Sequence, residues 1–253
     1  MSLVDLYRQQ YPWRPWARIH ALLGDLSGQT VLDLGCGVGD QAADLARLGA
    51  DVVGVERNEA LVDAARARSI PRARFLCEDI TSAALDGLRA HGIWLAFTVA
   101  HFPRVEGLLA RAERWLRPGG WLAITEVDDL FGQEPLAERH RALAEAYYAR
   151  SLQEGIYAFR SRATVREGLL ARGWRIEEDE EFPDRELSFT GPADADVLDA
   201  WRARLDLMLP RFVERFGPEA ASSFRDAFLD SMRSPAHRSR ARVWFVMARA
   251  PGR

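Results

Sequence analysis

The sequence predicts a doubly wound α/β fold, in which a mostly parallel sheet is covered by helices on both faces. Three observations indicate this class. Short apolar runs alternate with helical patterns at the spacing of βαβ units through the first half of the chain. A glycine-rich turn, VLDLGCGVGD at residues 31–40, follows the first apolar run. A length of 253 residues suits one such domain with insertions.

The first half of the chain divides into elements in the following order. Residues 1–29 are predicted as an N-terminal helical segment interrupted by Pro12 and Pro15, whose rings are poorly tolerated inside a helix. A core at 30–128 follows. Apolar runs bounded by turn signals predict its strands, at 30–35, 51–56, 74–79, 93–98 and 121–127. Helical periodicity predicts helices at 41–49, 60–69 and 105–116, and RPGG at 117–120 is predicted as a turn.

The pattern changes after residue 128. Two helical cap insertions are predicted, one within 129–163 with its helix at 133–160, the other at 193–232. The last strands are predicted within 164–192 and 233–253, at 174–182 and 241–250, the first of them after a helix ended by Gly173. No repeat or linker divides the chain, so we expect a single domain with a Rossmann-like, seven-stranded sheet.

Composition excludes several classes of function. The chain contains no lysine, so all 34 basic residues are arginine, and Schiff-base or Walker-lysine chemistry is excluded. The net charge of −3 argues against a nucleic-acid partner. No apolar run reaches the ~18 residues of a membrane helix, and the N-terminus does not read as a signal peptide. Two cysteines, Cys36 and Cys77, are too few for a disulfide framework, which favours a cytoplasmic location; we expect Cys77 to be buried.

The glycine-rich turn departs from the dinucleotide fingerprint GxGxxG, because its glycines are Gly35, Gly37 and Gly39 and Asp40 follows. Carboxylates surround it. Glu56 ends the second strand, where it could accept hydrogen bonds from both hydroxyls of a ribose. Asp79, at the end of the third strand, could accept one from an adenine amino group or could merely cap the next helix. Asp33 would repel a pyrophosphate and favour a cationic ligand. The pattern suits an adenosine that carries a positively charged amino acid.

With these motifs the chain resembles the class I S-adenosylmethionine-dependent methyltransferases, small-molecule type. VLDLGCGVGD, VVGVE, RFLCEDI and LRPGGWLAI match the family's motifs in order, over roughly residues 28–128 and more weakly in the last two strands. The resemblance implies S-adenosyl-L-methionine as the cofactor. It also implies the residues that contact it: the three loop glycines with Asp33 and Cys36, Glu56 at the ribose, Asp79 with Arg57 and Ile80 at the adenine, and Thr98 near the methionine moiety.

The segment TVAHFPR after the fourth strand is where this family meets its substrate, which makes His101 the candidate base or substrate contact, with a core histidine as the alternative. Aromatic residues near the start of the chain and in the insertions could line an apolar substrate cleft, or could simply pack helices; they are Trp13, Trp16, Tyr147, Tyr148, Tyr157 and Trp201. Arg14 or Arg18 could reach the cofactor's carboxylate.

A metal site is the weaker interpretation of the acids Glu126, Asp128 and Asp129, because the fourth strand ends in Phe97 and Thr98 and contributes no carboxylate. We therefore expect no metal. The acidic run EEDEEFPDRE is interpreted as a solvated strand face and loop. The leading hypothesis is methyl transfer to oxygen, nitrogen or carbon of a small molecule. The alternatives are an S-adenosylmethionine-binding protein without methyl transfer, or an NAD(P)-binding oxidoreductase.

Overall fold

A seven-stranded sheet forms the centre of the molecule, as the sequence predicts. The computed structural model describes residues 3–82, 85 and 87–252, and the strand order over this part is β3-β2-β1-β4-β5-β9-β7. The parallel strands are β1 (Thr30–Leu34), β2 (Asp51–Glu56), β3 (Ala73–Cys77), β4 (Ala90–Ala96) and β5 (Leu116–Asp128). β9 (Arg242–Arg249) runs antiparallel to β5 and to β7 (Arg175–Phe182). Of the predicted terminal segments, residues 1–2 and 253 lie outside the described residues.

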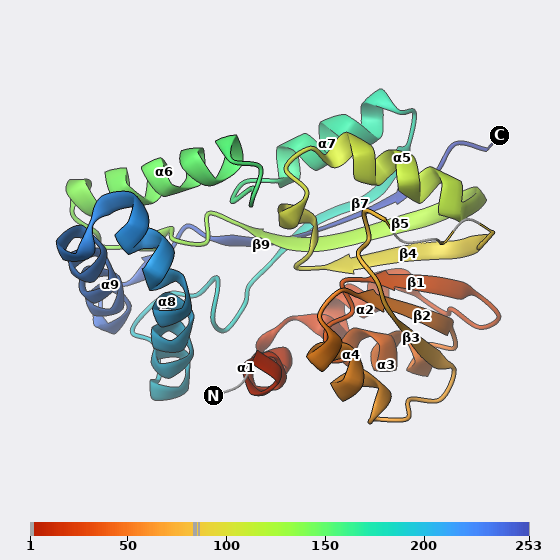
Figure 1. Cartoon of the computed structure of the whole chain (residues 1–253), viewed down its shortest axis with the longest axis horizontal. Coiled ribbons are helices and arrows are strands. Elements are labelled where there is room, and N and C mark those ends of the chain that lie inside the picture. Colours follow the sequence, from red (N-terminus) through yellow and green to blue (C-terminus); the bar gives the residue numbers. More distant parts are fainter. Residues whose placement is uncertain (1–2, 83–84, 86, 253) are drawn as a thin grey trace.

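Helices cover both faces of this sheet (Figure 1). On one face lie α5 (Val105–Trp115) and α7 (Arg162–Ala171), and on the other α2 (Trp16–Leu23), α3 (Asp40–Arg47) and α4 (Glu59–Arg66). Successive strand side chains point to opposite faces, so β1 contributes to two cores. Leu32 and Leu34 pack in the cluster with α5 and α7, and Val31 packs in the cluster with α2, α3 and α4.

Three further helices, α6 (Glu138–Gln153), α8 (Ala195–Phe216) and α9 (Pro218–Arg233), form what we call the helical cap. Figure 1 shows it at one end of the molecule, beyond the ends of β5 and β9. The cap has its own aromatic core. Phe131 lies within 6 Å of the rings of Tyr148, Phe212 and Phe224, at 5.7, 5.7 and 5.6 Å between centroids. Val127 and Leu130, at the end of β5 and just beyond it, belong to the same cluster and join cap to sheet.

Some predicted boundaries in the insertions are wrong. The helix expected at 133–160 begins only at Glu138, because Gln133–Glu134 forms strand β6, which pairs with β8 (Arg238–Ser239) far along the chain. The helical insertion predicted at 193–232 consists of two helices, α8 and α9. Gly217 has a φ of +84° and Pro218 begins the next helix, a pairing of residues that ends one helix and starts another.

The predicted turn RPGG lies inside β5 as a bulge. Leu116 pairs with Ala90 and Trp121 with Gly92, so residues 117–120 face a single residue of β4. Strands β3 and β4 each end two residues earlier than predicted, at Cys77 and Ala96. Asp79 and Thr98 therefore lie in the loops just beyond these strands. Cys77, expected in the core, is exposed at the end of β3, because β3 is an edge strand.

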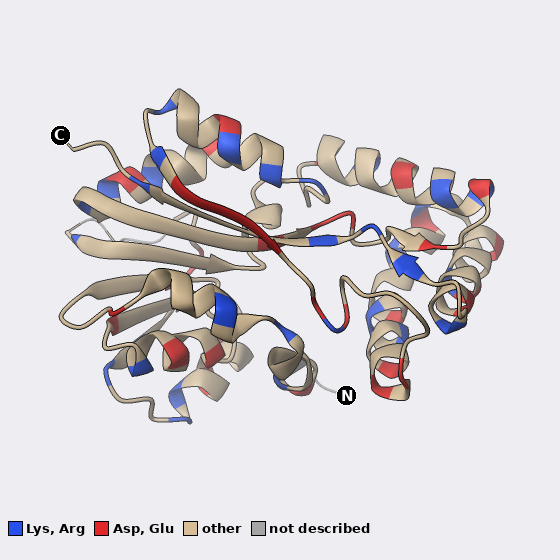
Figure 2. Cartoon of the chain, turned by 180° about the vertical axis from the view of Figure 1, so that it is seen from behind, with Lys and Arg blue, Asp and Glu red and all other residues tan. Residues whose placement is uncertain are grey.

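Charge protects the outer edge of the sheet. β7 is an edge strand, and Figure 2 shows the acidic stretch 177–181 running along it. Asp179 pairs with Arg162 at 2.7 Å, and Glu177 pairs with Arg249 at 3.1 Å. Rows of charge on an edge strand disfavour pairing with a second chain. Most of the acidic run is therefore the polar strand face that the sequence predicts, but Asp184 and Glu186 in the same run are buried, against that prediction.

Candidate cofactor and acceptor site

One cavity of about 540 Å³ lies where the strand order reverses between β1 and β4, beyond the carboxyl ends of the strands. This is the place where open α/β sheets bind ligands. Nine of the residues predicted for the site line it, namely Gly35, Cys36, Gly37, Glu56, Arg57, Asp79, Ile80, Thr98 and His101. Gly39 and Asp33 lie beside and beneath the glycine loop and do not line the cavity.

The glycine loop is held against β2 and shaped by its glycines. The backbone N–H groups of Gly35 and Cys36 donate to the carbonyl of Val55, at 2.8 and 3.2 Å. Gly35 has a φ of +81°, and a Cβ there would come within 2.3 Å of the Thr98 hydroxyl oxygen. A Cβ on Gly37, at a φ of +52°, would meet nothing within 4 Å. Gly35 therefore allows Thr98, in the loop after β4, to lie close to the backbone of the glycine loop. Gly37 leaves space in the cavity for a ligand.

Gly39 has a different role from the other two loop glycines. A Cβ at this position would lie 3.0 Å from the ring of Phe75 and 3.2 Å from Ala65. The residue precedes the first turn of α3 with a left-handed backbone conformation, at a φ of +79°. Its glycine is explained by packing between helix α3 and the sheet, so the expected contact with the cofactor is not supported here.

Glu56 lines the cavity and is held by two backbone N–H groups. One carboxylate oxygen accepts from the backbone N–H of Asn58 at 2.9 Å, and the other lies 3.4 Å from that of Gly37. Two charged oxygens offer about four acceptor sites. The two remaining sites are available for a pair of hydroxyls in the cavity, as the sequence predicts.

Asp79 serves its own turn as well as the cavity. Its Oδ1 accepts from the backbone N–H of Thr81 at 2.7 Å and from the Thr81 hydroxyl at 2.6 Å. These two bonds lower the pKa of Asp79, and the Arg57 guanidinium at 4.0 Å acts in the same direction. The carboxylate is thus ionised, anchors the loop after β3, and keeps its second oxygen for a ligand. The local anchoring role considered from the sequence is present, and the contact with adenine stays a prediction.

Asp33 is a buried carboxyl group without a hydrogen-bond partner among the described residues. The residue is 1% exposed. Burial, and to a lesser extent the negative charge of Glu56, raise its pKa to about 8. Buried carboxylates are expensive unless paired. A cationic ligand in the loop above would lower that cost, so these residues fit a sulfonium or ammonium group. Burial also raises the pKa of the Cys36 thiol, which makes that group a poor nucleophile.

His101 lies on the acceptor side of the cavity. It ends a short 3-10 turn, Val99–His101, directly beyond β4, and its ring meets the edge of Tyr157 with centroids 4.9 Å apart. His101 lines the cavity and is exposed to solvent over part of its surface. This partial burial lowers the pKa of His101, with smaller contributions from Arg57 and Arg211. A neutral imidazole near pH 7 can accept a proton.

Glu126 is the site residue that the sequence reading valued too little. It is fully buried on β5, lines the cavity, and accepts backbone N–H bonds from Val127 at 3.0 Å and Ala100 at 3.2 Å. Burial raises its pKa to about 8. A single carboxylate near the carboxyl end of the apolar strand WLAITEV was the signal available in the sequence. From the sequence, Glu126 is expected only as one acid of the metal alternative.

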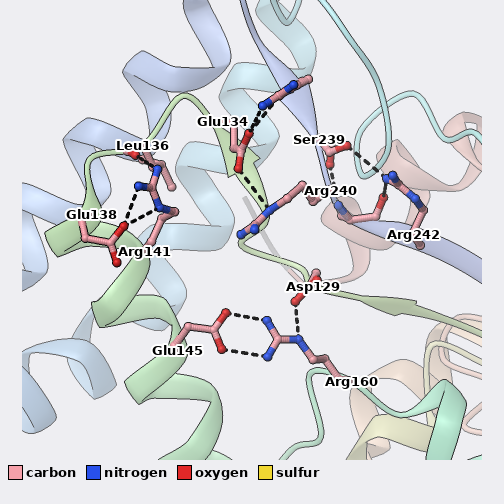
Figure 3. A network of polar contacts seen from close by, with 12 residues as sticks. Asp129, Glu134, Leu136, Glu138, Arg141, Glu145, Arg160, Ser239, Arg240 and Arg242 are labelled. Atoms are coloured by element: carbon pink, nitrogen blue, oxygen red, sulfur yellow. Dashed lines mark hydrogen bonds and ion pairs between the residues drawn. The ribbon is translucent and has the colours of Figure 1, made fainter.

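The other two acids of the metal alternative have structural partners. Asp128 accepts from the backbone N–H of Ser161 at 2.8 Å and from the indole of Trp244 at 3.0 Å. Asp129 binds Arg160, which also forms a two-pronged pair with Glu145 (Figure 3). Within the described residues, no three His, Cys, Asp or Glu side chains are grouped as metal ligands. The expectation of a metal-independent site stays a prediction.

Three aromatic residues predicted to contact substrate do not line the cavity. Tyr147 stacks on Phe212 in the helical cap at 4.0 Å between centroids. The Tyr148 hydroxyl accepts from the backbone N–H of Phe131 at 2.6 Å in the same core. Trp13 lies under the guanidinium of Arg185, 4.9 Å from its ring centre. Packing, the alternative considered from the sequence, explains all three, and it also explains Trp201. Aromatic residues that do line the cavity include Tyr11, Trp16, Phe97 and Tyr157.

The predicted role of Arg14 also needs correction. Its guanidinium is buried and binds Asp184 at 2.9 Å and Glu186 at 2.6 Å, and Arg204 of α8 binds Glu186 at 2.6 Å. Arg18 lies over the ring of Phe182, 5.0 Å from its centre. The Arg14 guanidinium is thus paired with two carboxylates, and Arg18 is exposed and does not line the cavity. Arg14 instead ties the N-terminal segment to the β7–α8 connection and the cap.

Parts of this chain are similar in sequence to known proteins. A family model described as a methyltransferase domain matches residues 32–124. Trans-aconitate 2-methyltransferase of Deinococcus radiodurans is 36% identical over 116 residues, 44% of this chain and 42% of that protein. Sterol 24-C-methyltransferase of Eremothecium gossypii is 29% identical over 174 residues, 64% of this chain and 44% of that protein. The chain thus spans less than half the length of either relative.

The fold is shared over nearly the whole chain. Phosphoethanolamine N-methyltransferase 2 of Haemonchus contortus, in complex with S-adenosyl-L-methionine, superposes with a TM-score of 0.60 at 19% identity, covering 98% of this chain and 57% of that one. Within the described residues, no helix combines the length and the apolar character that crossing a membrane requires. The methyltransferase-domain model thus matches residues 32–124, the segment that contains the glycine loop and strands β2, β3 and β4, and the fold of the solved structure agrees with this chain beyond that segment.

Proposed function

We propose that the protein transfers a methyl group from S-adenosyl-L-methionine to a small-molecule acceptor. The observation that carries the proposal is the continuity of the cavity along the carboxyl edge of the sheet. The groups suited to adenosine, Glu56 and Asp79, follow β2 and β3, and the glycine loop follows β1. Beyond Thr98 the cavity continues to His101 and Glu126, which no adenosine contact employs. One space therefore offers a cofactor end and an acceptor end.

The residues present fit the cofactor. Gly37 leaves room for a ligand at the loop, Glu56 has two acceptor sites free, and the unpartnered Asp33 lies beneath. The cofactor, when bound, supplies a methyl group already activated by a sulfonium. The protein's own contribution is then to hold the acceptor in line and to exclude water. His101, neutral near pH 7, could remove a proton from the acceptor.

The surroundings of the cavity favour an enclosed small molecule. Tyr7, Gln10 and Arg14 of the N-terminal segment and Arg204 of the cap contribute to its walls, so two segments far from the sheet help to close it. A net charge of −3 gives no basic footprint for nucleic acid. We also propose that core and cap act as one methyltransferase domain, because Val127 and Leu130 continue the sheet into the cap core. Free thiols at Cys36 and Cys77 suit a cytoplasmic enzyme.

The oxidoreductase alternative is disfavoured by the charge at the start of α3. Asp40 occupies the first turn of that helix and lines the cavity, where a dinucleotide would place its pyrophosphate. Glu56 adds a second carboxylate to the cavity wall. Binding of S-adenosylmethionine without methyl transfer is the second alternative, since a cofactor pocket does not by itself identify the reaction.

Calorimetry followed by a turnover assay distinguishes the methyltransferase, the oxidoreductase and the protein that only binds S-adenosylmethionine. We expect a one-site isotherm with S-adenosylhomocysteine and no heat of binding with NADH; the reverse result would support the oxidoreductase. Wild type and His101→Ala are then incubated with S-adenosyl-L-methionine and panels of phenols and amines, and formation of S-adenosylhomocysteine is measured. Binding without turnover on any acceptor would favour the pure binding protein. If His101 is the base, the variant should keep its affinity for S-adenosylhomocysteine and lose ~10²–10⁴-fold in rate.

A further inference from the structure

We propose that Glu126 makes the acceptor end of the cavity a site for a cationic amine, and that it takes up the proton which the amine must lose before methylation. This inference rests on the proposed methyltransferase function and narrows its acceptor from oxygen, nitrogen or carbon to nitrogen.

Position is the first argument. Glu126 lies on β5, one strand beyond β4 and two beyond the glycine loop of β1, so it is at the opposite end of the cavity from Glu56. Its Oε2 accepts from the backbone N–H of Ala100, in the turn that carries His101. Thr98, which packs against Gly35, precedes that turn. The carboxyl group therefore borders the space just past the place where the methionine end of the cofactor would lie.

Charge is the second argument. Glu126 is 0% exposed, and its pKa is affected by burial, by two backbone N–H bonds and by the like charge of Asp128, with no cation among the causes. The arginines on the cavity wall nearest the cap do not compensate it, because Arg14 and Arg204 are bound to Asp184 and Glu186. A neutral amide oxygen could accept backbone N–H bonds at a lower cost of burial. The carboxylate is explained if its partner is a ligand.

The walls are the third argument. Phe97, Tyr157 and Trp16 line the cavity. The ring of Phe97 already lies under one cation, the guanidinium of Arg14, at 5.3 Å from its centre. Phe97 also has a φ of +51°, a backbone conformation that bulky residues rarely adopt. Aromatic faces attract cations, and they do so more strongly where water is excluded. Aromatic walls around one uncompensated carboxylate are the surroundings in which an ammonium group is stabilised.

The chemistry balances within these residues. In the ligand-free protein Glu126, with a pKa of about 8, is mostly protonated near pH 7, and it releases this proton to solvent as the ammonium group binds. The bound ammonium group then loses one N–H bond, its proton forms an O–H bond with the Glu126 carboxylate, and the electron pair stays on nitrogen. That pair is the nucleophile that methyl transfer needs. A hydroxyl acceptor would gain less from this site, because an uncharged group does not offset the buried charge.

Matched probes test the inference without knowledge of the natural acceptor. With the protein saturated by S-adenosylhomocysteine, calorimetry measures the binding of 2-phenylethylamine and 4-phenylbutylamine against the corresponding alcohols at neutral pH. We expect wild type to prefer each amine about 10–100-fold, the equivalent of a hydrogen bond between charged groups. Glu126→Gln should reduce the preference to within about threefold while leaving the affinity for S-adenosylhomocysteine unchanged.

The matched control is Asp128→Asn, which removes another part-buried carboxylate on the same strand that does not line the cavity. It should keep the preference for amines. Equal binding of amine and alcohol by wild type, absence of amine binding at either chain length, or a preference that survives in Glu126→Gln would each overturn the inference. The comparison of amine and alcohol binding by the wild-type protein tests the inference even if Glu126→Gln fails to fold. Failure of S-adenosylhomocysteine to bind wild type would instead count against the proposed function itself.

Discussion

At the scale of single residues, the site depends on carboxylates whose surroundings differ. Glu56 is fixed by backbone N–H groups and keeps free acceptor sites. Asp79 is ionised and held by Thr81. Asp33 and Glu126 are buried, with pKa values of about 8. The first two suit neutral hydroxyl and amino donors of an adenosine, and the last two suit positive charge. Carboxyl groups in different surroundings are thus expected to meet different parts of the proposed cofactor and acceptor.

Glu56→Ala should weaken the binding of S-adenosylhomocysteine by about 1.5–3 kcal/mol, the usual cost of hydrogen bonds to a charged group. The loop N–H of Gly37 would also lose its partner, which acts in the same direction. Titration calorimetry measures the change. Glu59→Ala, on the exposed start of α4, is the matched control and should bind as wild type does. Wild-type affinity in Glu56→Ala would remove this residue from the ribose site.

Asp33 should make the ligand-free protein less stable at alkaline pH. Its pKa is about 8 in the folded protein against about 4 when unfolded, so the folded state binds more protons between these values. The free energy of unfolding therefore falls as pH rises from about 4 to about 8. We expect Asp33→Asn to lose less free energy of unfolding between pH 5 and pH 8 than wild type does, as measured by urea denaturation at both pH values. The part of the decrease that comes from the raised pKa of Glu126 should remain. Asp63→Asn, exposed on α4, should change nothing. An identical pH dependence in Asp33→Asn would show that its carboxyl ionises normally.

At the scale of elements, the N-terminal segment and the cap are locked together beside the cavity. Arg14 meets Asp184 and Glu186, Gln10 donates to Glu186 at 3.2 Å, and Arg204 of α8 binds the same carboxylate. Local propensity cannot specify this arrangement, because the partners lie about 170 residues apart in sequence. The cluster decides how the first helices lie over the site.

Arg14→Ala should lower the free energy of unfolding by about 3–5 kcal/mol, because it leaves two buried carboxylates with too little positive charge. Denaturant titration at pH 7 measures this. Arg18→Ala removes a cation whose guanidinium lies over the ring of Phe182, and it should cost about 0.5–2 kcal/mol. Equal losses in the two variants would mean that the cluster contributes no more than a surface contact.

At the scale of the whole molecule, the site is assembled from strand ends, the N-terminal segment and the cap, and each acid near β5 has a protein partner or faces the cavity. Added Mg²⁺ should therefore leave the melting temperature and the affinity for S-adenosylhomocysteine unchanged. Turnover, once an acceptor is found, should survive EDTA. A ligand that binds only the folded state would raise the melting temperature. Stabilisation by millimolar Mg²⁺, or activity abolished by EDTA and restored by Mg²⁺, would return Glu126 and Asp128 to a metal site.

The sequence by itself determined the sheet, most of its helices and the cofactor end of the cavity. These features depend on local signals: apolar runs, the glycine loop, and carboxylates such as Glu56 directly at strand ends, whose position follows from the parallel arrangement of the strands. The same locality explains the errors. The helix expected from residue 133 starts at Glu138 because residues 133–134 form β6, which pairs with β8 about a hundred residues later in the sequence. RPGG forms a bulge because β4 pairs with β5 on both sides of it.

Only the tertiary structure decided which polar and aromatic residues outside the motifs reach the cavity. Tyr147 and Tyr148 were plausible lining residues, but cap packing buries them in a separate aromatic core. Arg14 was a plausible cofactor contact, but two distant carboxylates bind it. Glu126 faces the site because β5 lies beside β4 and the turn after β4 donates to it. Burial and charge pairing arise from contacts between segments far apart in sequence, and those contacts exist only once the chain has folded.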